Sequence, residues 1–279
     1  MRFSFLFFLP AVSSIPSKLA ALTKITRISE NILPVSGLVA ISALTPPSLP
    51  LQNTFMTTFG MVHALTYVSM IVNDIWDLEA DRINHPTRPL VTGDLTVKEA
   101  WIAALTLTAA YIGGGIHLSQ RGYWMFPMIT IYLYTPVLKK IPLIKNLSCA
   151  AVISTTVDFI RGTFYSPNSY PLRKLIFIWS MTNEIFLDIA DEVGDFQAGV
   201  RTLPVLFGKT KTIVGLFFFI CWNQMSRDPF FIAYFPFYYY LWRVHRNGST
   251  KKNIKEVCKQ LTFVLLGIGL YLTKLEIIS

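Results

Sequence analysis

Long runs of apolar residues, separated by short polar stretches, repeat along the whole chain. A run of about 17–25 apolar residues is long enough to cross a bilayer as a helix. Membrane-spanning strands would alternate apolar and polar residues with a period of two, and these runs do not. The pattern therefore predicts an all-α, multi-pass membrane bundle of about nine transmembrane helices around a central cavity. The expected spans centre on residues 28–46, 54–75, 98–118, 123–138, 147–166, 173–190, 210–224, 228–243 and 257–274.

The N-terminal residues are also apolar, but they are too few to form a span. Residues 1–12 (MRFSFLFFLPAV) have the features either of a cleaved signal peptide or of an interfacial segment that is retained. Retention is the favoured interpretation, because basic residues between Lys18 and Arg27 precede the first span. The expected organisation is an apolar N-terminal segment, residues 1–25, followed by a single transmembrane domain, residues 26–279.

Composition supports the membrane interpretation and excludes several other classes of protein. Hydrophobic residues make up 52% of the 279 residues, charged residues only 15%, and the mean hydropathy is +0.47. A soluble fold could not cover this much apolar surface with so few charges. The three scattered cysteines (Cys149, Cys221 and Cys258) fit neither a disulfide scaffold nor a zinc site.

The net charge of +9 reflects membrane orientation. Most Lys and Arg residues fall in the N-terminal segment and in alternate loops, which the positive-inside rule places in the cytoplasm. The surplus of basic residues thus requires no nucleic-acid partner. The basic residues also suggest contact with membrane lipids. An endoplasmic-reticulum location is expected if the source is a eukaryote.

Acidic residues are concentrated in two short windows that follow the second and sixth expected spans. Nine of the 16 acidic residues lie there: Asp74, Asp77, Glu79, Asp81, Glu184, Asp188, Asp191, Glu192 and Asp195. A solvated loop would be the ordinary explanation of a single charge run. Helical spacing argues against it here, because both windows place their acids on one stripe of a helix. Two carboxylate stripes that face each other require neutralising cations.

The two windows also mark a weak internal repeat. The separation from Asp77 to Asp191 equals that from Asp81 to Asp195, and each window precedes a turn with Arg, Pro and Gly. The chain is therefore expected to consist of two related halves with a site between them, open to the cytoplasm.

Carboxylate oxygens at this density favour Mg²⁺, which binds through a few carboxylates and leaves sites for substrate phosphate. Nearby basic residues could clamp a diphosphate bridged by the metal. They are Arg88, Lys139, Lys140 and Arg201. The chemistry inferred from these residues is ionisation of an allylic diphosphate, with the carbocation held in a dry, aromatic-lined pocket.

Three segments together resemble the signatures of the UbiA superfamily of intramembrane prenyltransferases. NDIWDLEADRINHPTRPLVTG (73–93) is similar to its first Asp-rich motif, and DIADEVGDFQAGVRTLPVLFG (188–208) to its second. LYTPVLKKIPLIKN (133–146) resembles its Tyr-and-Lys loop, and Arg27 with Asn31 resembles its early polar pair. The chain departs from the family pattern in the spacing of Tyr134 from Lys139 and in Lys145, which replaces a common Gly.

The resemblance implies a role for each matching residue. One Mg²⁺ would be held by Asn73, Asp77 and Asp81, and a second by Asp191 and Asp195, with Asp74 and Asp188 in support. Further residues would bind the substrate: Asn31, Arg88, Lys139, Lys140, Asn146 and Arg201. Tyr134 would lie near the reacting carbon, and Asp77, Asp81, Asp191 and Asp195 would act in catalysis.

The resemblance implies a Mg²⁺-dependent transfer of a prenyl group from an isoprenyl diphosphate to a lipophilic or aromatic acceptor, with release of pyrophosphate. Two alternatives stay open. Some members of the superfamily are terpene cyclases, which would convert a C15 or C20 diphosphate without an acceptor. An ion-coupled transporter could also use intramembrane carboxylates, although both acidic windows lie at helix ends. Neither prenyl chain length nor the acceptor follows from the sequence.

Overall fold

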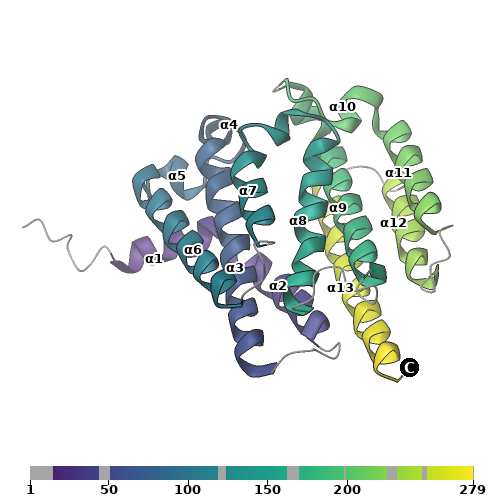
Figure 1. Cartoon of the computed structure of the whole chain (residues 1–279). Coiled ribbons are helices and arrows are strands. Elements are labelled where there is room, and N and C mark those ends of the chain that lie inside the picture. The colour runs from purple at the N-terminus through teal and green to yellow at the C-terminus, as the bar shows by residue number, and fades with distance from the viewer. Residues whose placement is uncertain are drawn as a thin grey trace, which may run out of the picture.

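The computed structural model describes residues 15–43, 51–118, 124–161, 170–197, 199–224, 231–246 and 250–278. Within these ranges the chain is helical and contains no strand (Figure 1). The all-α prediction is confirmed. Residues 1–12, expected to be retained, lie outside the described residues.

Each of the nine expected spans overlaps one of the longer helices in the described part of the chain. These helices are α2 (Ile28–Ala43), α3 (Leu51–Trp76), α6 (Val97–His117), α7 (Met125–Tyr134), α8 (Ile144–Arg161), α9 (Tyr170–Gln197), α11 (Lys209–Gln224), α12 (Phe235–Arg246) and α13 (Lys251–Ile278). Their order and approximate positions agree with the apolar pattern. Among the described residues, two stretches are long and apolar enough to cross a membrane by length and composition, Phe55–Trp76 in α3 and Val97–His117 in α6. Membrane crossing by the other helices stays a prediction.

Helix α7 is shorter than the expected span over 123–138. It ends at Tyr134, and a turn leads into the 3-10 helix η2 (Leu138–Lys140). Pro136 contributes to this end, because proline has no amide hydrogen to donate to the preceding turn. The backbone leaves the helical path at Val137 (φ −124°, ψ −63°). The early end leaves Lys139 in η2, within the connection between α7 and α8.

Short helices cap the bundle at the ends of α3 and α9. They are α4 (Leu78–Asn84) and α5 (Pro89–Thr92) after α3, and α10 (Leu203–Phe207) after α9. Figure 1 shows α4 and α10 at the same end of the molecule. The remaining short elements are α1 (Ile15–Ile25) and the 3-10 helix η4 (Phe231–Tyr234).

The two caps share a local design, which supports the predicted repeat. In each, an arginine precedes a short helix with proline in its first turn, and a glycine with positive φ ends it. Gly93 (φ 81°) ends α5 and Gly208 (φ 78°) ends α10. Gly93 has the left-handed helical conformation (ψ 5°), whereas Gly208 combines its positive φ with an extended ψ of 156°. Glycine adopts both without a Cβ penalty.

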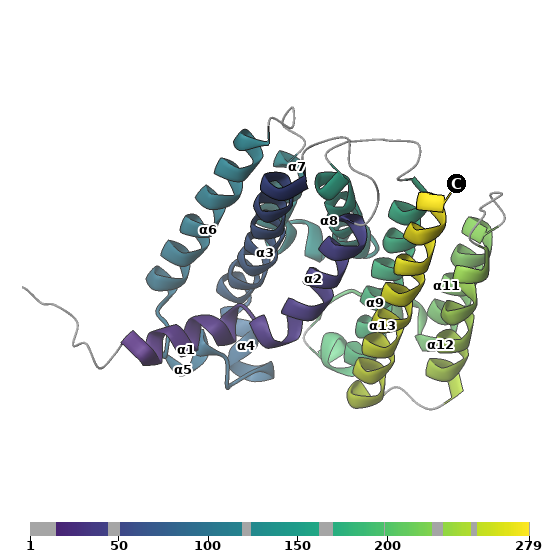
Figure 2. The same ribbon diagram turned by 90° about the horizontal axis from the view of Figure 1, so that it is seen from below.

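The two largest hydrophobic clusters divide most of the described helices into an N-terminal and a C-terminal half. Residues such as Val68, Ala104 and Ile131, from α3, α6 and α7, form the first core. Residues such as Phe186 and Leu261, from α9 and α13, belong to the second, which also includes α11 and α12. Helix α2 contacts α3 on one side and α8 and α13 on the other, and Figure 2 shows it between the halves.

Candidate active site

The first acidic stripe runs across the junction of α3 and α4. The amide of Asp77 donates to the carbonyl of Asn73 at 2.9 Å, and the amide of Asp81 donates to the carbonyl of Asp77 at 2.8 Å. These four-residue steps continue the helical path through the break, so the three side chains stay on one side. The predicted i, i+4, i+8 stripe is therefore present in the backbone.

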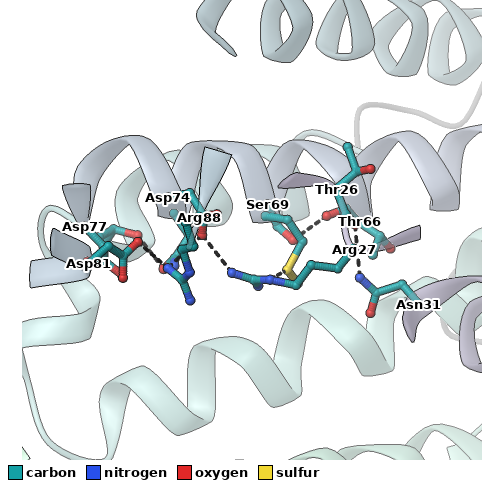
Figure 3. A network of polar contacts seen from close by, with 12 residues as sticks. Thr26, Arg27, Asn31, Thr66, Ser69, Asp74, Asp77, Asp81 and Arg88 are labelled. Carbon is teal, nitrogen blue, oxygen red and sulfur yellow. Dashed lines mark hydrogen bonds and ion pairs between the residues drawn. The ribbon is translucent and has the colours of Figure 1, made fainter. Parts of the chain in front are cut away.

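Asp74 lies beside this stripe and is almost completely buried, at 2% exposure. Its Oδ1 accepts hydrogen bonds from two guanidinium groups, Arg27 at 2.7 Å and Arg88 at 3.0 Å. Arg88 also contacts the buried carboxylate of Asp81, and Figure 3 shows Asp74 between the two arginines. A buried carboxylate is tolerated only when it is paired in this way. Arg27 is held at a φ of 51°, a left-handed conformation that is costly for a side chain with a Cβ.

The connection between α7 and α8 supplies two further contacts to the stripe. Lys139 Nζ lies 2.5 Å from Asp77 Oδ2, and the hydroxyl of Thr135 donates to Asn73 Oδ1 at 3.2 Å. The structure thus brings Arg88 and Lys139 to the first acidic motif. Lys140 and Arg201 are exposed to solvent.

The second stripe lies wholly within α9, where Asp188 is its most buried acid at 5% exposure. Lys145 Nζ contacts Asp188 Oδ1, and Asn146 Nδ2 donates to Asp188 Oδ2 at 3.0 Å. Both partners come from the first turn of α8 and are buried. Asn146, expected to bind substrate, therefore holds an acid of the second motif. Asp191 and Asp195 are partly buried further along α9.

A cavity of about 420 Å³ lies between the two halves. Its walls come from α2, α3, α7, α8, α9 and α13, and they are mostly apolar. Asn73 from the first stripe and Glu184 from the second both line it, so each acidic stripe begins at the cavity wall. Tyr134 and Asn31 line it as well, and Asn31 Nδ2 also donates to the carbonyl of Thr26 at 3.3 Å.

The donors at the two stripes fit Mg²⁺ in their chemistry, since all are carboxylate or amide oxygens. Among the described residues, no three or more His, Cys, Asp or Glu side chains are grouped closely enough to hold a metal. Basic side chains instead hold Asp74, Asp77, Asp81 and Asp188. This arrangement is compatible with Mg²⁺, which usually binds through one or two carboxylates together with substrate phosphates.

Two side chains at the site were given no role by the sequence reasoning. Lys145 was noted only as a departure from the family pattern, and Glu184 only as one acid of a stripe. A lysine at a helix N-terminus opposes the helix dipole, so its presence in the first turn of α8 was a signal that it has a nearby acidic partner. Which acid it meets depends on the packing of α8 against α9.

Comparison with known proteins gives the family of the chain. A sequence profile of the UbiA prenyltransferase family matches residues 32–266. A digeranylgeranylglyceryl phosphate synthase from Methanospirillum hungatei is 32% identical over 189 residues, which cover 64% of this chain and 66% of that protein. The chain thus matches just under two thirds of that relative's length.

Solved structures agree with the fold. A structure described as digeranylgeranylglyceryl phosphate synthase in membranes has a TM-score of 0.69 at 20% identity, covering 91% of this chain and 99% of the other. A UbiA homologue from Archaeoglobus fulgidus bound to GPP and Mg²⁺ has a TM-score of 0.67 at 18% identity, with the same coverage. The resemblance inferred from the two acidic motifs is confirmed, and the chain belongs to the UbiA prenyltransferase family.

Proposed function

We propose that this protein is a membrane-embedded, Mg²⁺-dependent prenyltransferase that transfers the prenyl group of an isoprenyl diphosphate to a lipophilic acceptor and releases pyrophosphate. The observation that supports this most directly is the position of the cavity. It is largely apolar, it lies between the halves, and an acidic stripe with basic partners begins at its wall on each side.

The residues of the first half bind the diphosphate in this proposal. Arg88 and Lys139 already contact carboxylates of the first motif. When a diphosphate binds, each of these basic side chains exchanges a carboxylate partner for a phosphate oxygen. Arginine suits this exchange because its planar fork binds phosphate with two parallel hydrogen bonds. Arg27 lines the cavity and pairs with Asp74. This pair keeps the positively charged guanidinium group close to the diphosphate end of the substrate.

Mg²⁺, when bound, would neutralise charge on the departing pyrophosphate. The residues that would hold it are Asn73, Asp77 and Asp81 on one side and Asp191 and Asp195 on the other, with Asp74 and Asp188 as supporting acids. The apolar remainder of the cavity excludes water and accommodates the prenyl chain. Tyr134 lines the same wall and offers a ring face to an allylic cation.

The relatives suggest which acceptor to test first. The name digeranylgeranylglyceryl phosphate describes a glyceryl phosphate that carries two geranylgeranyl groups. The matching acceptor is geranylgeranylglyceryl phosphate, and the matching donor is geranylgeranyl diphosphate.

We extend the proposal to a multi-pass membrane location with the caps of α3 and α9 on the cytoplasmic side, as the distribution of basic residues favours.

Product analysis on the purified protein in lipid nanodiscs tests this function. Geranyl, farnesyl and geranylgeranyl diphosphate are each supplied alone and with geranylgeranylglyceryl phosphate, in Mg²⁺ and in excess EDTA. Acceptor-dependent prenylation that EDTA abolishes is the expected result. A cyclic terpene formed without acceptor would instead establish a cyclase of the same superfamily. No consumption of any diphosphate would refute both.

A further inference from the structure

Glu184 is a carboxylate in the cavity wall that the proposed binding of diphosphate does not use. It lies on α9, one helical turn before Asp188, and it is the single carboxylate among the described residues that line the cavity. Several acids of the two motifs have a basic partner within 4 Å, among them Asp74, Asp77, Asp81 and Asp188. In the part of the chain that the structure describes, no such ion pair involves Glu184.

The neighbours of Glu184 leave it able to accept a further hydrogen bond. The polar side chains beside Glu184 in the cavity wall include Cys149 on α8 and Tyr134 on α7. All three side chains line the cavity. A thiol is a weak donor, whereas an ionised carboxylate offers about four acceptor positions. Acceptor capacity therefore remains on a carboxylate that faces a mostly apolar space, which is costly unless a ligand uses it.

Prenyl transfer to an alcohol requires such a group. The acceptor's hydroxyl oxygen must lose a proton when it bonds to the allylic carbon, and the proton needs a base within the water-excluding cavity. Asp74, Asp77, Asp81 and Asp188 are held by guanidinium or ammonium groups, so they are poor proton acceptors. Glu184 has no such partner among the described residues, and it lies in the wall of the space where donor and acceptor must meet.

We propose that Glu184 is the general base of the transfer step and marks the subsite for the acceptor's hydroxyl group. This rests on the prenyltransferase function proposed above. The allylic carbon–oxygen bond of the prenyl diphosphate breaks, and its electron pair leaves with pyrophosphate. The acceptor oxygen forms a new bond to the allylic carbon, and its proton passes to a carboxylate oxygen of Glu184.

The test is the partition of geranylgeranyl diphosphate between two products in Glu184→Gln. The reaction contains geranylgeranylglyceryl phosphate as acceptor. The amounts of transfer product and of geranylgeraniol are each measured relative to the pyrophosphate released. Geranylgeraniol is the alcohol formed when water captures the cation. Loss of a general base typically costs about 10²–10⁴-fold in rate. We expect the ratio of transfer to hydrolysis to fall at least about tenfold, while total pyrophosphate release changes much less. The ratio does not depend on how much of the variant folds.

Two further variants complete the experiment. Glu184→Asp keeps a carboxylate and should recover part of the transfer ratio. Glu192→Gln makes the same chemical change on the same helix, at a residue that does not line the cavity, and should leave the ratio as in the wild type. An unchanged ratio in Glu184→Gln would overturn the assignment of the base. Failure of the wild type to release pyrophosphate would overturn the proposed function itself.

Discussion

Asp188 and Lys145 form a buried ion pair whose two side chains are only 6% and 11% exposed. Removal of one partner from a buried pair leaves the other charge unpaired in a poor solvent and typically costs about 3–5 kcal/mol. Asp188→Ala should therefore lower the free energy of unfolding strongly. The double change Asp188→Leu with Lys145→Met should recover most of it, because an apolar pair needs no neutralisation.

The free energy of unfolding is measured by denaturant titration in detergent micelles, with circular dichroism as the signal. Glu79→Ala is the matched control, since Glu79 is 85% exposed and lies 3.7 Å from Arg82. An exposed pair of this kind contributes about 0–1 kcal/mol. Equal stability of Asp188→Ala and Glu79→Ala would show that the buried pair has no structural role.

A change at Asp77 is predicted to lower activity strongly and stability only slightly, whereas Asp188→Ala is predicted to lower stability strongly. Its ion pair with Lys139 is more open to solvent, at 18% and 32% side-chain exposure, so loss of the pair should cost about 1 kcal/mol or less. If Asp77 helps to stabilise the departing pyrophosphate, Asp77→Asn should lower turnover by about 10²–10³-fold.

Initial rates of pyrophosphate release from geranylgeranyl diphosphate measure the loss at Asp77. Glu79→Gln, two residues away on the exposed side of α4, should retain the wild-type rate. A fully active Asp77→Asn would remove Asp77 from the proposed metal ligands.

Residue contacts were the part of the site that could not be predicted from sequence. The acidic stripes follow from spacing alone, because backbone geometry fixes which side chains share a helix face. The partner of each acid does not, since Asp77 meets Lys139 across 62 residues and Asp74 meets Arg27 across 47. Such pairs depend on how the helices pack.

Helix α1 is an element whose contacts suggest a supporting role for the first cap. Lys24 Nζ donates to the carbonyl of Thr87 at 2.6 Å, next to Arg88. Lys18 Nζ contacts both the carbonyl of Asp94 and the carboxylate of Glu99 at 3.0 Å. Figure 2 shows α1 alongside α5, at a steep angle to α3 and α6. We infer that α1 fixes the turn that presents Arg88.

Lys24→Met should consequently weaken substrate binding without removing a catalytic group. Loss of one hydrogen bond of this kind is worth about 0.5–1.5 kcal/mol, so the KM for prenyl diphosphate should rise about two- to tenfold with kcat nearly unchanged. Lys98→Met, at an exposed position near the start of α6, is the control. A fall in kcat alone would contradict a role through Arg88.

At the scale of elements, the apolar pattern predicted the helices well and their lengths less well. All nine expected spans overlap a long helix within the described ranges. The early end of α7 was not predicted, although the sequence contains Pro136. The apolar run continues past this proline through Val137 and Leu138, so the pattern predicted a longer helix. The division of the acidic segment into α4 and α5 was also missed, since it reflects local turn chemistry rather than hydrophobicity.

The whole molecule consists of two halves with their own hydrophobic cores and a cavity between them. The sequence indicated this through the equal spacing of the acidic motifs and through the shared Arg-Pro-Gly turns. Prenyl chain length could not be predicted, because the cavity wall combines residues of α2, α9 and α13, for example Val35, Ile176 and Leu266. These residues are far apart in sequence and become neighbours only in the folded bundle.

The most direct measurement is binding of geranylgeranyl S-thiolodiphosphate, a donor analogue that resists ionisation, to the full-length protein in nanodiscs. Calorimetric titrations with and without Mg²⁺ compare the wild type with Asp77→Asn from the first half and Asp191→Asn from the second. If acids from both halves jointly bind the metal and the diphosphate, Mg²⁺ should tighten binding in the wild type, and each single variant should lose that gain. Wild-type Mg²⁺ dependence in either variant would contradict a site shared between the halves.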